Sequence, residues 1–253
     1  MSFRPRIIPI LQLSGKGLVK TRAFKDPVYV GDPINTVKIF NDFRADELVL
    51  VDIEASVKDQ PIQFELIKRI AEEAFMPLTY GGGVNSIEQA AQLIHAGVEK
   101  IILGTALHTN PGLVSEIASR FGSQAVLACV DVKKQNDSYD VYFKSGTLSS
   151  TLNVLDLTDQ VIQAGAGELL LQFIDTDGYG KGLDHTFVKV VSERISVPLI
   201  VAGGISSLEE MKELTVHAGA SAAAAGSLFS FLGGRNSVLI NYPDADELKD
   251  VFE

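Results

Sequence analysis

The segment Pro77–Glu88 (PLTYGGGVNSIE) recurs 121 residues later as Pro198–Glu209 (PLIVAGGISSLE). Each copy joins a short apolar run to a Gly-Gly pair and then to an amphipathic stretch. The correspondence continues in order through His-Ala-Gly at 95–97 and 217–219, and through glycine plus a hydroxyl residue at 104–105 and 226–227. A repeat close to half the chain length predicts two homologous halves rather than a solenoid.

Short apolar runs alternate with amphipathic stretches along the chain. Eight runs, rich in Val, Ile, Leu and Ala as strands buried on both faces are, span 7–13, 48–53, 77–80, 101–103, 126–132, 168–174, 198–202 and 222–225. Amphipathic stretches span 61–74, 86–96, 111–121, 152–164, 184–195 and 207–218, and several end at a glycine that suits a helix C-cap. Eight strand–helix units predict an α/β fold, a (β/α)8 TIM barrel built from two homologous half-barrels, over an open doubly wound sheet. We expect residues 1–253 to form one domain.

The composition excludes several classes of protein. The 253 residues carry a net charge of −10 and no basic run, so we expect no nucleic-acid partner. No apolar run reaches the ~18 residues of a membrane span, and the N-terminus resembles no signal sequence, so we expect a cytoplasmic protein. Cys129 is the sole cysteine and the four histidines lack metal-ligand spacing. With no Walker loop or G-x-G-x-x-G after the first strand, neither a metal nor a cofactor is expected.

The repeated glycines lie where a barrel carries its function, at the C-terminal ends of the strands. Gly82-Gly83 and Gly203-Gly204 follow the third and seventh strands, and Gly104-Thr105 and Gly226-Ser227 follow the fourth and eighth. Glycines let the backbone N–H groups approach an anion, and a hydroxyl adds one more donor. These loops predict two phosphate sites on opposite sides of one mouth. The alternative is that the glycines only form tight turns.

Asp131 ends the apolar run 126–132, and a carboxylate at the top of a core strand needs either partners or a function. A loop-capping role is the alternative. Asp52 and the Asp177-Gly178 turn occupy similar strand ends. Cys129 is interpreted as a small core residue rather than a nucleophile.

Four charged residues mark the opposite face of the predicted barrel: Arg6, Glu47, Lys100 and Glu168 each begin a strand. Two positive and two negative charges therefore converge there. From spacing alone, a ring of ordinary solvated or paired surface charges, which stabilise little, is favoured over a functional role.

A set of short motifs carries a family resemblance. They are Arg6-Ile-Ile-Pro9, Gly17-Leu-Val-Lys20, Asp46-Glu-Leu-Val-Leu-Val-Asp52, Tyr80-Gly-Gly-Gly83, Phe121-Gly-Ser-Gln124, Asp131 with Lys133, Gly165-Ala-Gly-Glu168, Asp175-Thr-Asp-Gly178 and Gly203-Gly204. Over roughly residues 6–231 the chain resembles the cyclase subunit of imidazole glycerol phosphate synthase, the HisF family. The resemblance implies a two-protein machine in which a HisH-like glutaminase docks on the N-terminal face of the barrel and releases ammonia into it.

The resemblance also assigns roles to residues. Arg6, Glu47, Lys100 and Glu168 match the family's ammonia gate, which reverses the solvated interpretation of these charges. Gly83 and Thr105 match one phosphate site, and Asp177, Gly178, Gly204 and Ser227 match the other. Lys20 matches a flexible-loop lysine that covers a doubly phosphorylated substrate. Asp131 matches the second of two catalytic aspartates.

The first catalytic aspartate of the family falls on Gln12, which cannot exchange a proton in the relevant pH range. Gly104, Gln172 and Ala202 also depart from the family pattern, as does the tail at 229–243. An intact gate below an altered mouth resembles the HisF-like paralogues linked to acetamidino-sugar formation in bacterial surface polysaccharides. That branch implies delivery of ammonia for amidination of a nucleotide-activated or modified sugar, with a separate sugar amidotransferase as a further partner.

Other functions remain open from the sequence. One is a genuine cyclase, a lyase of histidine biosynthesis that tolerates Gln12. Another is a non-catalytic scaffold or ammonia conduit. A sugar-phosphate isomerase on the same half-barrel plan would not need the four charges at the strand starts.

Overall fold

Parallel strands form a closed barrel in this computed structural model, which describes residues 4–232 and 237–252. We call the parallel strands of the barrel its staves. Each stave pairs with the next, and the last pairs with the first, so that the barrel closes. Within the described residues the staves are β1 (Arg6–Ser14), β4 (Leu48–Asp52), β5 (Leu78–Gly81), β6 (Lys100–Leu103), β7 (Val126–Gln135), β10 (Glu168–Phe173), β11 (Leu199–Ala202) and β12 (Ala222–Ala225). The predicted (β/α)8 TIM barrel is confirmed, with all eight apolar runs forming staves.

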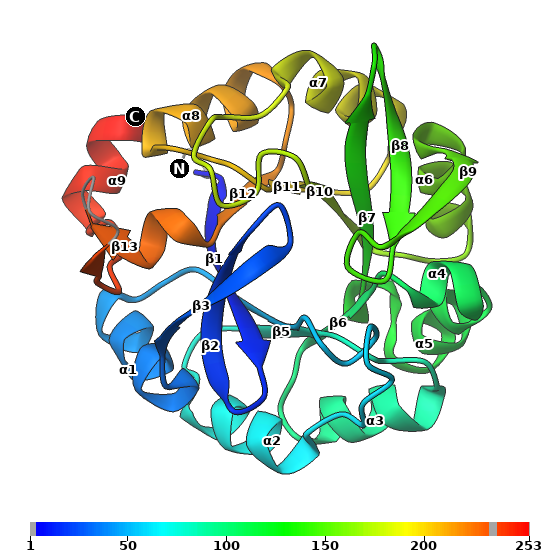
Figure 1. Ribbon diagram of the computed structural model, residues 1–253, viewed down its shortest axis with the longest axis horizontal. Coiled ribbons are helices and arrows are strands. Elements are labelled where there is room, and N and C mark those ends of the chain that lie inside the picture. The colour runs from blue at the N-terminus through cyan, green and yellow to red at the C-terminus, as the bar shows by residue number, and fades with distance from the viewer. Residues whose placement is uncertain (1–3, 233–236, 253) are drawn as a thin grey trace.

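Helices surround the barrel on its outside (Figure 1). They are α1 (Pro33–Phe43), α2 (Phe64–Glu73), α3 (Ile87–His95), α4 (Ala106–Thr109), α5 (Leu113–Phe121), α6 (Val154–Gln163), α7 (His185–Arg194), α8 (Leu208–Lys212) and α9 (Ala245–Phe252). The amphipathic stretch predicted over 207–218 is helical, but its second half, Glu213–His217, widens into a π-helix. The stretch predicted over 61–74 becomes helical only from Phe64.

The two copies of the repeat build the same local structure. In each, a serine caps the helix after the Gly-Gly turn: Ser86 accepts from the backbone N–H of Gln89, and Ser207 accepts from that of Glu210. The side chain three residues after each cap accepts in turn from a backbone N–H at the start of the helix. Gln89 accepts from the N–H of Ser86, and Glu210 accepts from that of Ser206. The repeat therefore fixes the same strand–turn–helix geometry at two places in the mouth.

Two β-hairpins stand on the C-terminal face and were not predicted. The first, β2 (Gly17–Arg22) and β3 (Lys25–Gly31), follows the first stave, and the second, β8 (Ser138–Phe143) and β9 (Leu148–Asn153), follows the fifth. They thus occupy equivalent positions in the two halves. Figure 1 shows the first hairpin reaching over the barrel opening.

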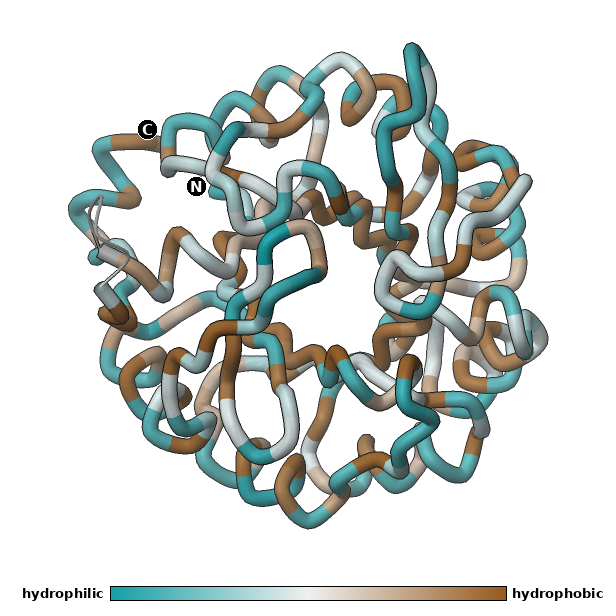
Figure 2. Tube along the Cα trace, viewed as in Figure 1, coloured by the Kyte–Doolittle hydropathy of each residue, from teal (hydrophilic) through white to brown (hydrophobic). Residues whose placement is uncertain are grey.

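The apolar core lies in two layers. Side chains on the outward faces of the staves pack against the helices in one large cluster. A smaller cluster fills the barrel interior and consists of Ile8, Ile10, Val49, Ile102, Leu127, Leu170, Ile200, Ala202, Ala222 and Ala224. In Figure 2 the hydrophobic colour gathers on the strands around the centre, whereas the helices alternate between hydrophobic and hydrophilic segments. This interior layer separates the charged end of the barrel from its mouth.

Candidate functional site

The four charges predicted at the strand starts form a closed cycle of ion pairs. Arg6 donates to Glu47 at 2.7 Å and to Glu168 at 2.8 Å. Lys100 contacts the same two carboxylates, at 3.1 Å and 2.8 Å. Thr79, on β5, adds a hydroxyl donor to Glu47 at 2.9 Å. We call Arg6, Glu47, Lys100 and Glu168 the ring; each of its cations contacts both of its carboxylates.

Three of the four ring side chains are largely buried, whereas that of Arg6 is 31% exposed. The side chain of Glu47 is 3% exposed, and those of Glu168 and Lys100 are 12% and 16% exposed. Burial by itself lowers the pKa of Arg6, but the carboxylates of Glu168 and Glu47 more than offset this, and its pKa is raised. Of the two arrangements that strand spacing favoured, solvated or paired charges, the structure shows the paired one.

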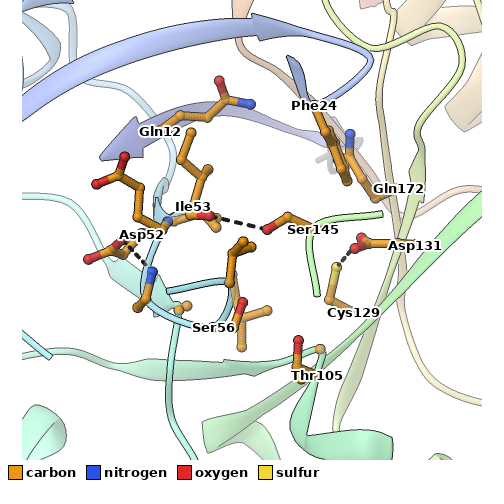
Figure 3. Close-up of a pocket in the computed structure, with 18 of the residues that line it drawn as sticks. Gln12, Phe24, Asp52, Ile53, Ser56, Thr105, Cys129, Asp131, Ser145 and Gln172 are labelled. Carbon is orange, nitrogen blue, oxygen red and sulfur yellow. Dashed lines mark hydrogen bonds between the residues drawn. The ribbon is translucent and has the colours of Figure 1, made fainter. Parts of the chain in front are cut away.

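A cavity of about 740 Å³ occupies the other end of the barrel. It is lined by Gln12, Lys20, Gly83, Gly104, Thr105, Asp131, Asp177, Gly178, Gly204, Gly226 and Ser227, whereas Ala202 packs in the interior layer instead. Figure 3 shows side chains from several strands converging on it. The volume suits a small-molecule ligand.

Asp131 lies on β7 at the side of this cavity, next to Cys129 (Figure 3). The thiol of Cys129 lies 3.4 Å from Oδ1 of Asp131. Burial raises the pKa of Asp131 to about 7, with a smaller contribution from Asp177. A carboxyl group with a pKa near 7 can act as either an acid or a base at neutral pH. Cys129 lines the cavity as well, and burial raises its pKa well above the usual value, which agrees with an unreactive thiol.

Gln12 is held in a network of hydrogen bonds at the opposite side of the cavity. Its Oε1 accepts from both the N–H and the hydroxyl of Thr21, at 3.1 and 3.2 Å. The Thr21 hydroxyl also lies 3.4 Å from Asp177, which accepts from Gln172 at 3.4 Å. Burial raises the pKa of Asp177. The side chain of Gln12 is thus engaged in binding the β2–β3 hairpin.

Lys20 lies on strand β2 rather than in a loop, and its side chain points into the barrel. It is 4% exposed, and its Nζ donates to the carbonyl of Ile10 at 2.5 Å. A Cβ on Gly226 would collide with Nζ, so the ammonium group lies directly against one of the predicted phosphate sites. Burial lowers the pKa of Lys20 to about 8, partly opposed by Asp177.

Two glycines of the predicted phosphate sites, Gly83 and Gly204, are tightly packed. A Cβ on Gly83 would lie 2.9 Å from Cβ of Ala55, and one on Gly204 would lie 2.6 Å from Cβ of Thr176. Both have positive φ, +73° and +126°. The turns therefore require glycine in their own right, and phosphate binding at these loops stays a prediction.

The turn between β8 and β9 also contributes to the mouth, which was not predicted from the sequence. The N–H of Lys144 donates to the hydroxyl of Thr105 at 3.1 Å, and the hydroxyl of Ser145 donates to the carbonyl of Ile53 at 3.2 Å (Figure 3). The turn thereby joins loops from three staves. Alternating apolar residues in 138–143, followed by Gly146, are the signal that could have revealed it.

Neither a metal cluster nor a membrane span is found in the described part of the chain. Across residues 4–232 and 237–252, no group of three or more His, Cys, Asp or Glu side chains is arranged to hold a metal ion. Within the same ranges, no helix has the length and apolar character to cross a membrane.

Known proteins resemble this chain over nearly its whole length. The profile of the histidine biosynthesis protein family matches residues 6–233. A Vibrio vulnificus protein named "Putative imidazole glycerol phosphate synthase subunit hisF3" is 43% identical over 252 residues, which cover 99% of this chain and 97% of the relative. The imidazole glycerol phosphate synthase subunit HisF of Helicobacter hepaticus is 41% identical over 232 residues, 91% of this chain and 92% of the relative. With a closed barrel, a buried ring and a polar mouth, this chain belongs to the HisF family of histidine biosynthesis proteins.

Proposed function

We propose that this chain is the synthase subunit that accepts ammonia from a HisH-like glutaminase at its N-terminal face and delivers it to a phosphorylated substrate at the mouth. The finer part of the proposal is the reaction: ammonia serves to amidinate a sugar or nucleotide-sugar, with a separate sugar amidotransferase as a further partner. The observation that carries it is an intact ring below a mouth in which Gln12 is committed to Thr21.

The interior of the barrel supports a route for neutral ammonia. Above the ring the wall is apolar, with Ile8, Val49, Leu127 and Ala222 among its residues. An ammonium ion would lose its hydration there without compensation, whereas neutral ammonia loses much less. Ring and wall together favour passage of the uncharged molecule.

The mouth supports a change of chemistry. Gln12 cannot exchange a proton near neutral pH, and its carbonyl oxygen is already occupied by Thr21. Asp131 remains available on the other side of the cavity. Cyclisation that needs an acid and a base on both sides of the substrate would lose ~10²–10⁴-fold in rate if one of the two carboxyl groups is absent.

A true imidazole glycerol phosphate synthase cyclase is the second candidate. It is favoured by Asp131, whose pKa of about 7 fits acid–base catalysis. The names of the relatives in Vibrio vulnificus and Helicobacter hepaticus point in the same direction.

Two measurements on the purified protein separate these functions. With a HisH-like glutaminase, the proposal expects a complex, stimulated glutaminase activity, and loss of ammonia to solvent when Lys100 is changed to Ala. With ammonium salt and the formimino-ribulosyl substrate of the histidine pathway, it expects little turnover. Substantial turnover that Asp131→Asn abolishes would establish the cyclase and refute amidination. If the complex forms but its ammonia transfer is unchanged by Lys100→Ala, the conduit role is refuted and a non-catalytic scaffold remains as the function.

A further inference from the structure

Tyr242, in the C-terminal part of the chain, lies at the N-terminal face of the barrel and binds the first strand there. Tyr242 is 4% exposed, and its hydroxyl donates to the carbonyl of Ile7 at 2.9 Å, a contact across 235 positions of the chain. The same hydroxyl accepts from the N–H of Asp46 at 3.4 Å. Tyr242 thus joins residues adjacent in sequence to Arg6 and Glu47 of the ring.

Asp46 binds the other main-chain group of Ile7, its N–H. Its carboxylate accepts from the N–H of Ile7 at 2.9 Å and forms a two-bond ion pair with Arg4, at 2.6 and 2.7 Å. The N–H of Ile7 is therefore bound by Asp46 and its carbonyl by Tyr242. Side chains satisfy both main-chain groups of this residue.

These contacts replace a missing part of the sheet. Strand β1 pairs with β12 from Arg6 upward, but it pairs with β4 only from Ile10 upward. At the level of the ring, no ladder hydrogen bonds are therefore assigned between β1 and β4. Asp46 and Tyr242 supply the link at that level, between the two strands that carry Arg6 and Glu47.

The aromatic ring of Tyr242 is held independently of its hydroxyl. It packs edge-on against Phe40 of α1, with centroids 6.4 Å apart, and against Phe229 at 5.4 Å. Burial raises the pKa of Tyr242, so the hydroxyl stays protonated and remains a donor. The hydroxyl can therefore be removed without removing the packing.

We propose that Tyr242 is a positioning residue for the ring, holding Arg6 and Glu47 in register through Ile7 and Asp46. This inference rests on the proposed function, in which the ring admits ammonia. Without the hydroxyl, the carbonyl of Ile7 loses its donor, and the lower ends of β1 and β4 can separate. The ring contacts of Lys100 should then loosen, although the two hydrogen bonds of the Tyr242 hydroxyl described above reach only the main chain of Ile7 and Asp46.

Tyr242→Phe tests this with two measurements. The first is trace acetylation of the free protein by acetic anhydride, read by mass spectrometry, because the Lys100 side chain is only 16% exposed while it is held in the ring. We expect a several-fold faster modification of Lys100, with no change at Lys68, which is 55% exposed on α2. The second is the fraction of ammonia lost to solvent from the complex with a HisH-like glutaminase, which should also rise several-fold.

The matched control is Tyr139→Phe. The hydroxyl of Tyr139 donates a hydrogen bond to Asp184 at 3.2 Å, and its side chain stacks on Phe187, so this tyrosine also sits in an aromatic cluster, but away from the four ion-paired residues. This variant should change neither measurement. If Tyr242→Phe does not fold, Asp46→Ala, which removes the acceptor of the Ile7 N–H, is the second variant, and it should also speed the labelling of Lys100. The inference is overturned if Tyr242→Phe lowers the thermal midpoint while labelling of Lys100 and ammonia loss stay at wild-type values. If Lys100→Ala itself causes no ammonia loss, the proposed function fails, and the acetylation rate still decides the role of Tyr242.

Discussion

Replacing Asp131 by Asn should stabilise the folded protein at pH 8 much more than at pH 5. The pKa of this carboxyl is raised from 3.8 to about 7 on folding, mainly by burial. A raised folded pKa means that the folded state favours the protonated form, so the carboxyl destabilises the fold increasingly as pH rises from 3.8 to 7, and by a constant amount above that. A tenfold change in an acid dissociation constant corresponds to about 1.4 kcal/mol, which gives roughly 4 kcal/mol for an unscreened group at pH 8.

Water reduces this magnitude, because Asp131 is half-buried and borders the cavity. We therefore expect Asp131→Asn to add about 2–4 kcal/mol to the free energy of unfolding at pH 8, and less than about 2 kcal/mol at pH 5. The thermal midpoint should rise by roughly 2–4 °C for each kcal/mol.

Thermal unfolding of both proteins at the two pH values measures this difference. The control is Asp137→Asn, since Asp137 is exposed in the turn between β7 and β8. Equal effects of Asp131→Asn at pH 5 and pH 8, or destabilisation at pH 8, would refute the reasoning, because the buried carboxyl would then not carry the penalty assigned to it.

Three further predictions concern the β2–β3 hairpin. Gln12→Ala removes both hydrogen bonds that Gln12 accepts from Thr21. The loss of about 1–2 kcal/mol of local stability should raise the rate of protease cleavage within this hairpin roughly 5- to 30-fold. An unchanged rate would show that the hairpin is held by other contacts. Gly178→Ala should lower the thermal midpoint more than Gly180→Ala, because both glycines have positive φ but only at Gly178 would a Cβ collide with the carbonyl of Thr21; equal losses would leave backbone strain as the sole cause. Lys20→Met should stabilise the protein by up to about 3 kcal/mol at pH 7 and little above pH 10.5. Because burial lowers the pKa of Lys20 to about 8, the buried charge opposes folding below that pH, and the effect disappears once the unfolded state is also neutral. Urea unfolding at both pH values measures the difference, and a pH-independent effect would contradict it.

The barrel was predictable because its signals are local. The repeated Gly-Gly turns and the apolar staves report buried parallel strands directly. The hairpins carry weaker signals: β3 is exposed over most of its length, and β9 alternates between exposed and half-buried positions. Helix α1 was not predicted, although its Asp32 cap followed by Pro33 is a readable helix start.

The gathering of the predicted residues around one cavity was predictable from the sequence, but their contacts were not. The mouth residues lie on one cavity, because the ends of parallel staves meet at one face. Burial of the ring could not be read from spacing, since Arg6 and Glu168 lie 162 positions apart and are joined only when the barrel closes. The inward direction of Lys20 was hidden for a similar reason: lysine is usually exposed, and only the folded hairpin brings it against Gly226.

The closed cycle of ion pairs makes the ring tolerant of movement. In a single buried salt bridge, withdrawal of one partner leaves the other charge uncompensated, which is strongly unfavourable. Here Glu47 and Glu168 share both cations, so if Arg6 swings away, each carboxylate keeps Lys100 as a partner. Arg6 is also the more exposed of the two cations, at 31%, and can be rehydrated as it leaves. Redundancy of this kind leaves each carboxylate with a cationic partner when Arg6 moves aside, although the remaining three side chains then carry one net negative charge.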